Sequence, residues 1–145
     1  MEKMPPIEKI YEAYTAIADQ RIELSENEAR IYSSDRKKRY TVSREGNTYR
    51  SDDSATYWQG YPGYPVIAVL MLEGRLPYDK ETAELFSYVN WNALNKKYKR
   101  DYAAAAREVM KERNMDVSAV EEKAQAVYEE LKKLPIELKR GKSAS

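Results

Sequence analysis

RYTVSREGNTYR, residues 39–50, carries the pattern from which the rest of the architecture can be worked out. Tyr40 and Val42 alternate with polar residues, so they share one face of an extended strand. Residues 45–47, Glu-Gly-Asn, interrupt the alternation, and the glycine supplies the positive φ that tight hairpin turns require. Residues 48–50 then return as a second strand. The segment therefore predicts a β-hairpin.

Extended structure continues upstream of this hairpin. Ile22 and Leu24 alternate with charged residues, and Ala29 and Ile31 do the same after a polar turn. Together with the hairpin, these runs predict a meander of three or four short antiparallel strands. Before the meander, apolar residues at helical spacing predict a helix over about 6–19. These residues are Ile7, Ile10, Tyr11, Tyr14 and Ile17.

The apolar run Val66–Leu72 follows the meander. Pro65 suits the first turn of a helix, and Gly74 suits the position just after its last turn. These boundaries predict a short buried helix at about 65–73. A buried strand is the alternative, because a run that is apolar on every side has no period that separates the two.

Residues 79–113 predict further helical structure. Asp79 is a candidate N-cap, Phe86 lies on the apolar face, and Asn114 can cap a second helix that ends near Arg113. The pattern leaves open whether these are two helices or one long, kinked helix.

The last helix has the clearest boundaries. Ser118 and Glu121 form an S-x-x-E capping box, and Pro135 ends the helix. Ile136 and Leu138 then alternate with charged residues, as in a short closing strand. We therefore predict an α+β fold in which an N-terminal helix leads into a small antiparallel meander and a helical C-terminal half packs on the sheet. One domain over residues 1–140 is expected, with a disordered tail at 141–145.

The composition narrows the chemistry. Among 145 residues there is no cysteine and no histidine, which excludes disulfides, thiolate nucleophiles and the usual imidazole base. Five glycines and no phosphate-loop motif argue against a glycine-built nucleotide cradle. The net charge of +1 is not that of a dedicated nucleic-acid binder. Abundant Glu, Lys, Arg and Tyr resemble a thermophile composition.

The sequence predicts a soluble, cytoplasmic protein with no membrane contact. The first apolar stretch is interrupted by charged residues such as Glu8 and Lys9, unlike a secretory signal. Val66–Leu72, the longest apolar run, is too short to span a bilayer.

A first candidate functional feature is the basic hairpin. Its positive side chains, interleaved with Tyr40 and Tyr49, form a pattern that can follow phosphates and stack bases. The alternative is a solvated hairpin whose charges protect an edge strand from aggregation. The candidate phosphate contacts are Arg36, Lys37, Lys38, Arg39, Arg44 and Arg50.

A second candidate is the aromatic segment, residues 51–65, SDDSATYWQGYPGYP. Its large rings suit a ligand pocket or a protein interface, or else they close the core where the sheet meets the helices. The candidate ligand or partner residues are Tyr57, Trp58, Tyr61 and Tyr64. A third candidate is the basic stretch, Lys96, Lys97, Lys99 and Arg100, with Tyr98 and Tyr102, which is either a second phosphate surface or a solvated helix face.

Carboxylates offer one route to catalysis. Asp52, Asp53 and Glu73 would be the first candidates for a divalent-metal site, for example that of a nuclease. The alternative is that Asp52 and Asp53 make hydrogen bonds to nearby backbone N–H groups in a turn.

The leading hypothesis is a non-enzymatic binding module centred on the aromatic segment and the basic hairpin. Its partner would be a protein, including a second copy of the chain, or a nucleic acid. The alternatives are a carboxylate- and metal-dependent enzyme and a purely structural homo-oligomer, for which the last helix offers an apolar stripe. No catalytic residue, metal ligand or cofactor is assigned.

Overall fold

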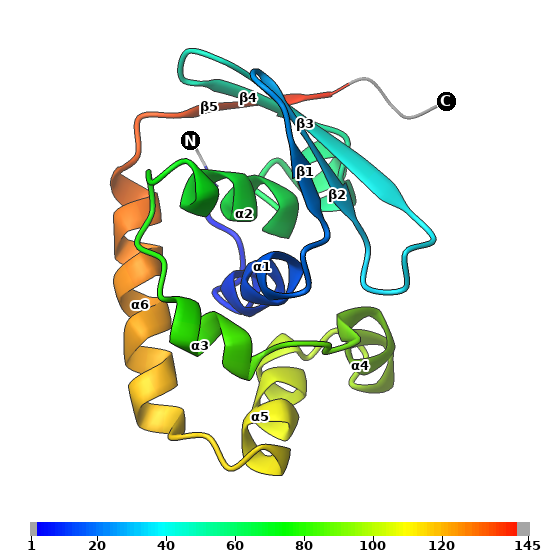
Figure 1. Ribbon diagram of the computed structural model, residues 1–145, viewed down its shortest axis with the longest axis vertical. Helices are drawn as coiled ribbons and strands as arrows, with labels where there is room; N and C mark the ends of the chain where they lie inside the picture. The colour runs from blue at the N-terminus through cyan, green and yellow to red at the C-terminus, as the bar shows by residue number, and fades with distance from the viewer. Residues whose placement is uncertain (1–2, 142–145) are drawn as a thin grey trace.

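The computed structural model describes residues 3–141 and shows a five-stranded sheet with helices packed against one face (Figure 1). The strands are β1 (Ile22–Leu24), β2 (Glu28–Tyr32), β3 (Arg39–Glu45), β4 (Thr48–Ser51) and β5 (Glu137–Arg140). The first four form the predicted antiparallel meander in sequence order. The α+β class is confirmed.

The β3–β4 turn follows the sequence pattern. Glu45 pairs with Thr48, and Gly46 adopts a φ of 60° between them. Tyr40 and Val42 share the face that meets the helices, and Val42 is buried. The predicted closing strand is present as β5, which pairs in parallel with β4. Parallel pairing requires a long connection, and the helical half of the chain supplies it.

Helices make up the other layer. They are α1 (Lys9–Ala18), α2 (Tyr64–Leu72), α3 (Lys80–Leu85), α4 (Trp91–Lys97), α5 (Tyr102–Glu112) and α6 (Val117–Lys133), with a short π-helical turn, η1, at Ala55–Gln59. The α2 helix lies against β3 and β4, and α1 packs on α2, α3 and α6. The core therefore sits between the sheet and α1, around Ile31, Tyr49, Ile67, Tyr14 and Phe86.

The run Val66–Leu72 is helical, as its proline and glycine boundaries predict. Gly74 follows the helix with a φ of 77°, the left-handed conformation in which a glycine is favoured. Because α2 is surrounded by the sheet and α1, its side chains from Pro65 to Met71 are buried. A helix that is apolar on every side is consistent with this central position.

One predicted helix boundary differs from the structure. The α6 helix is capped by Asp116, whose carboxylate accepts the Ala119 N–H, so the predicted cap at Ser118 is wrong. An acid two residues earlier makes the same kind of cap and lengthens the helix by two residues. Asn114, as predicted, ends α5 in the left-handed conformation with a φ of 54°.

Residues 79–113 form three separate helices rather than one or two. Asn90 and Asp101 cap α4 and α5 by accepting backbone N–H groups. The chain turns between these helices through positive φ values at Tyr88, Lys99 and Arg100. None of these three is a glycine, so the sequence carries no ordinary signal for the turns.

The C-terminal end of the described chain adds to the sheet. The Gly141 N–H donates a hydrogen bond of 2.8 Å to the Ser51 carbonyl. A Cβ at this glycine would lie 2.9 Å from the Ser51 carbonyl carbon, so the close approach favours glycine. The rest of the predicted tail, 142–145, lies outside the described residues. No helix within residues 3–141 is long and apolar enough to cross a membrane.

Candidate functional site

The aromatic segment is held in place by a buried aspartate. Asp53 accepts a hydrogen bond from the Thr56 N–H at 3.1 Å and another from the Ser51 hydroxyl. The Thr56 contact satisfies a backbone N–H in the first turn of η1, and Gly60 ends η1 with a φ of 75°. Gly63 packs directly on the Asp53 carboxylate. The rings that follow Asp53 therefore project from a fixed backbone.

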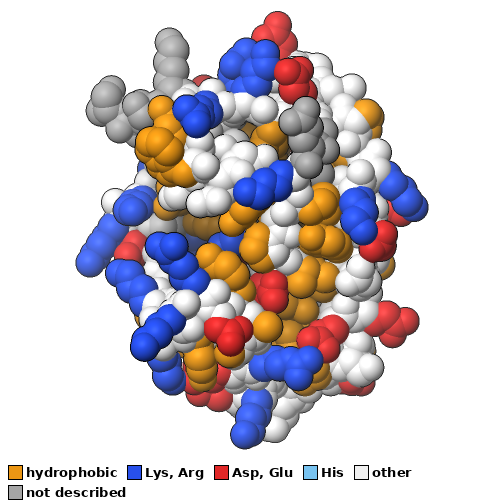
Figure 2. Space-filling view, turned by 180° about the vertical axis from the view of Figure 1, so that it is seen from behind, with side chains coloured by type: hydrophobic (Ala, Val, Ile, Leu, Met, Phe, Trp, Pro, Cys, Tyr) orange, Lys and Arg blue, Asp and Glu red, His pale blue; other side chains and the backbone are white. Residues whose placement is uncertain are grey.

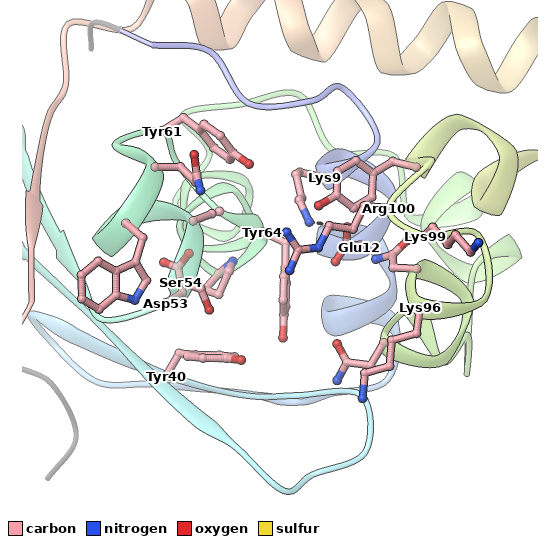
Figure 3. Close-up of a pocket in the computed structure, with 18 residues that line it drawn as sticks. Lys9, Glu12, Tyr40, Asp53, Ser54, Tyr61, Tyr64, Lys96, Lys99 and Arg100 are labelled. Atoms are coloured by element: carbon pink, nitrogen blue, oxygen red, sulfur yellow. Dashed lines mark hydrogen bonds and ion pairs between the residues drawn. The ribbon is translucent and has the colours of Figure 1, made fainter.

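A cavity of about 850 Å³ opens beside this segment. Its walls come from α1, β3, the aromatic segment, α4 and the linker between α4 and α5 (Figure 3). The aromatic lining residues are Tyr40, Trp58, Tyr61, Tyr64 and Tyr102. The charged ones are Lys9, Lys96, Lys99, Arg100, Glu12 and Asp53, and the amides are Gln59, Asn92 and Asn95. Figure 2 shows lysine and arginine side chains beside hydrophobic ones around a hollow on the rear face.

Three of the cavity's bases have no acidic partner. Lys96, Lys99 and Arg100 are exposed, and none forms a salt bridge with any acid in the part of the chain that the structure describes. Arg100 reaches toward Tyr64, whereas Lys96 and Lys99 stand at the rim (Figure 3). The cavity thus presents uncompensated positive charge next to aromatic rings.

Lys99 and Arg100 are held in an unusual backbone conformation. Their φ values are 52° and 68°, and consecutive left-handed residues with side chains are rare because Cβ approaches the following carbonyl. The Arg100 N–H donates to the Asn95 carbonyl at 2.8 Å, which closes the turn after α4. Strained backbone of this kind concentrates at functional sites.

The floor of the cavity holds one ion pair. Lys9 Nζ lies 3.0 Å from Glu12 Oε2, and both side chains are largely buried. Nζ also lies 4.4 Å from the centroid of the Tyr102 ring, a cation–π contact. Burial lowers the Lys9 pKa, but the charge and hydrogen bond of Glu12 outweigh it, so the net pKa is raised. Lys9 is therefore a fixed cation.

Three tyrosines of the cavity, Tyr40, Tyr61 and Tyr64, hold their phenolic protons more tightly than free tyrosine does. Burial is the main cause that raises the pKa of Tyr40, Tyr61 and Tyr64 above 10, so each keeps its phenolic proton. The rings of Tyr40 and Tyr64 meet edge to face with centroids 6.3 Å apart. These hydroxyls and ring faces can donate hydrogen bonds and stack without adding negative charge.

The four residues predicted in the aromatic segment do not all face one space. Trp58, Tyr61 and Tyr64 line the cavity, while Tyr57 lines a smaller hollow on the other side of η1. Trp58 is 71% exposed, whereas the other three rings are partly buried. The segment therefore forms a wall of the cavity, and its Tyr64 also packs against the hydrophobic core.

The predicted phosphate contacts of the basic hairpin are spread over three places. Arg36, Lys37 and Lys38 lie in the exposed β2–β3 connection. Arg39 and Arg50 point away from the helices, because their strand neighbours Tyr40, Tyr49 and Ser51 face inward. Arg44 faces the helices and pairs with Glu73 at 2.5 Å. The hairpin reaches the cavity only through Tyr40.

The three carboxylates considered for a metal site each accept hydrogen bonds from other groups of the protein. Asp53 accepts the Thr56 N–H, a local hydrogen bond of the predicted kind, whereas Asp52 accepts the N–H of Thr41 on β3 at 2.8 Å, which is not a turn contact. Glu73 accepts hydrogen bonds from Arg44 and from the Tyr49 hydroxyl. Within residues 3–141, no group of three or more acids could hold a metal ion.

Sequence reasoning identified two walls of the cavity but missed its floor. The basic stretch contributes Lys96, Lys99 and Arg100, whereas Lys97 pairs with Glu108 outside the cavity. Lys9 and Glu12 carried one usable signal: three residues apart on a helix, they form an i, i+3 pair. No sequence pattern indicated that Asn92 and Asn95 would line the cavity.

Comparison with curated proteins and with solved structures found no match to this chain. A family profile described as "Uncharacterised conserved protein UCP014422" matches residues 2–137, which is nearly the whole chain. The match spans both walls of the cavity and the α1 residues at its floor. This chain belongs to the family described as uncharacterised conserved protein UCP014422.

Proposed function

We propose that this protein is a binding module whose cavity takes a nucleotide unit, free or within a nucleic acid. The observation that carries the proposal is the Arg100 guanidinium, which extends without an acidic partner in residues 3–141 toward the partly buried Tyr64 ring. The proposal needs no general base, which suits a chain without histidine or cysteine.

Charge favours an anionic ligand. Four bases and two acids line the cavity, and one of those acids, Glu12, is neutralised by Lys9. Burial raises the pKa of the other, Asp53, so its carboxylate is protonated more readily than an exposed one. An Arg guanidinium matches two phosphate oxygens at once, and Lys96 and Lys99 at the rim add point charges.

The aromatic walls favour a planar group on that anion. Ring faces of tyrosine and tryptophan stack on bases of any sequence, each stack contributing about 1–3 kcal/mol. The amides of Asn92, Asn95 and Gln59 provide donors and acceptors of the kind that recognise base edges. The volume of about 850 Å³ lies within the usual range of small-molecule sites.

Calorimetric titration with nucleoside monophosphates tests the proposal. Free nucleosides and inorganic phosphate serve as partial ligands, because each supplies only one of the two recognised features. The monophosphates are expected to bind more tightly than either partial ligand, and their affinity should fall as salt rises.

Arg100→Glu is the decisive variant, and Lys111→Glu is its matched control. Lys111 is an exposed base on α5 that lies outside the cavity and receives the same change of charge. Arg100→Glu should weaken nucleotide binding by at least about tenfold, because it removes a charge-assisted hydrogen bond that contributes about 1.4 kcal/mol or more. Lys111→Glu should leave it within about twofold. Equal affinities for the two variants, or no binding at millimolar nucleotide, would refute the proposal.

A further inference from the structure

Trp58 lies between two hollows. It lines the large cavity on one side of η1 and a second hollow of about 290 Å³ on the other. Residues 56–60 and 138–140 form the second hollow, so the end of β5 is one of its walls. With 71% of its surface exposed, the indole stands in solvent at the boundary of the two spaces. Core packing does not account for such a position.

The second hollow has an uncompensated cation of its own. The Arg140 guanidinium carbon lies 4.9 Å from the Tyr57 ring centroid and 5.8 Å from that of Trp58. These ring contacts hold the side chain against the aromatic segment. No acid within residues 3–141 forms a salt bridge with Arg140. Its charge is therefore available to a ligand that passes Trp58.

We infer that the ligand is a single-stranded nucleic acid, which runs from the large cavity across Trp58 to Arg140. This inference rests on the proposed nucleotide site and extends it. One nucleotide has one phosphate and one base, and the large cavity alone satisfies both. A second free cation beyond an exposed indole fits the next units of a strand, in which phosphates and bases alternate along the chain.

A duplex fits this surface poorly. Its bases are stacked on one another and cannot reach Tyr64, which is recessed at the cavity wall, without being pulled out of the helix. An acidic peptide would satisfy Arg100 and Arg140 but would leave the row of ring faces without partners. The combination of separated cations and intervening rings therefore favours an unpaired strand.

Fluorescence anisotropy with a labelled oligothymidylate of about eight nucleotides tests the inference, at one fixed salt concentration. Thymidine monophosphate, a duplex of the same length and an acidic peptide are added as unlabelled competitors, and their affinities are compared with that of the oligothymidylate. The variants are Arg140→Glu, Trp58→Ala and, as a control of equal charge change, Lys111→Glu. All three sites are exposed, so the fold should persist, and circular dichroism checks it.

The oligonucleotide should bind at least about tenfold more tightly than the monophosphate, and Arg140→Glu should remove most of that gain. Trp58→Ala should weaken oligonucleotide binding by about tenfold, and Lys111→Glu should change nothing. If the monophosphate binds through Arg100 but length adds no affinity, or if duplex or peptide competes equally well, this inference fails and the proposed function stands. If Arg100→Glu alters neither ligand's affinity, the proposed function fails.

Discussion

Gly63→Ala should disrupt the aromatic segment and destabilise the whole protein. A Cβ at this position would lie 2.0 Å from Asp53 Oδ2 and 2.9 Å from its Cγ. Because real contacts to Cβ do not fall below 3.0 Å, the carboxylate has to move by roughly an ångström. That movement breaks the 3.1 Å hydrogen bond from the Thr56 N–H in the first turn of η1.

The expected loss can be worked out from these contacts. Overpacking a filled site costs about 1–3 kcal/mol. A buried acceptor that loses its partner costs about 1–3 kcal/mol more. The free energy of unfolding should therefore fall by about 2–6 kcal/mol, and Tm by roughly 7–20 °C for a chain of 145 residues. Backbone strain adds nothing, because the φ of Gly63 is −76°.

Thermal unfolding followed by circular dichroism measures the global loss, and tryptophan emission reports on the segment itself. Trp58 is 71% exposed and Trp91 only 3%, so a change in the solvent-exposed emission is assigned to Trp58. Gly46→Ala is the matched control. Its φ is 60° and a Cβ there meets nothing within 4 Å, so it should cost only the left-handed penalty of about 1–2 kcal/mol.

A double variant separates the clash from any other effect of the methyl group. If the clash is with the carboxylate, Gly63→Ala should cost much less in an Asp53→Ala background than in the natural chain. Additive losses in the double variant would show that the Asp53 contact is not the cause. A Gly63→Ala protein that melts within 2 °C of the unmodified one, roughly 0.6 kcal/mol, would refute the packing argument as a whole.

Two further predictions concern the same cavity. Burial raises the pKa of Asp53 above 3.8, so the folded state binds the carboxyl proton more tightly than the unfolded state does. The stabilisation that this proton provides is lost as pH rises through the folded pKa. Urea unfolding should therefore show Asp53→Asn gaining stability relative to the natural protein from about pH 4 upward, and a difference independent of pH would contradict this. Arg100→Gly and Gln20→Gly relieve φ values of 68° and 56°, so each should stabilise the fold by about 0.5–1 kcal/mol in thermal melts. Only Arg100→Gly should weaken nucleotide binding, and equal losses in both variants would show that the Arg100 side chain is not a contact.

Much of the fold follows from local signals in the sequence. The β3–β4 hairpin is fixed by alternation on either side of Gly46, and α2 by Pro65 and Gly74, all of which act within a few residues. The breaks at Tyr88 and at Lys99 could not be predicted, because residues with side chains there adopt a conformation that sequence patterns assign to glycine. Tertiary packing around α4 overrides the local preference.

The candidate site was harder to predict because it is made by long-range contacts. The aromatic segment and the basic stretch each stood out by composition, but nothing local indicates that Tyr64 and Arg100 face one cavity. The basic hairpin stood out equally, yet its arginines divide between the outer face and an ion pair at Arg44. Strand alternation separates neighbours in sequence, so a cluster of charges along a strand does not form one surface.

The α4–α5 linker holds two consecutive bases, Lys99 and Arg100, in left-handed backbone, a conformation that Arg36 in the β2–β3 connection also adopts. Lys97, one turn earlier, pairs with Glu108 at 2.7 Å and is accounted for by the fold. Lys99 and Arg100 have no such partner in residues 3–141, and each costs roughly 1–2 kcal/mol in a left-handed backbone that a glycine would adopt freely. A sequence selected for stability alone would hold glycine or asparagine there. Two unpaired bases at a strained turn, at the mouth of a cavity lined by tyrosines, are consistent with the proposed binding of an anion.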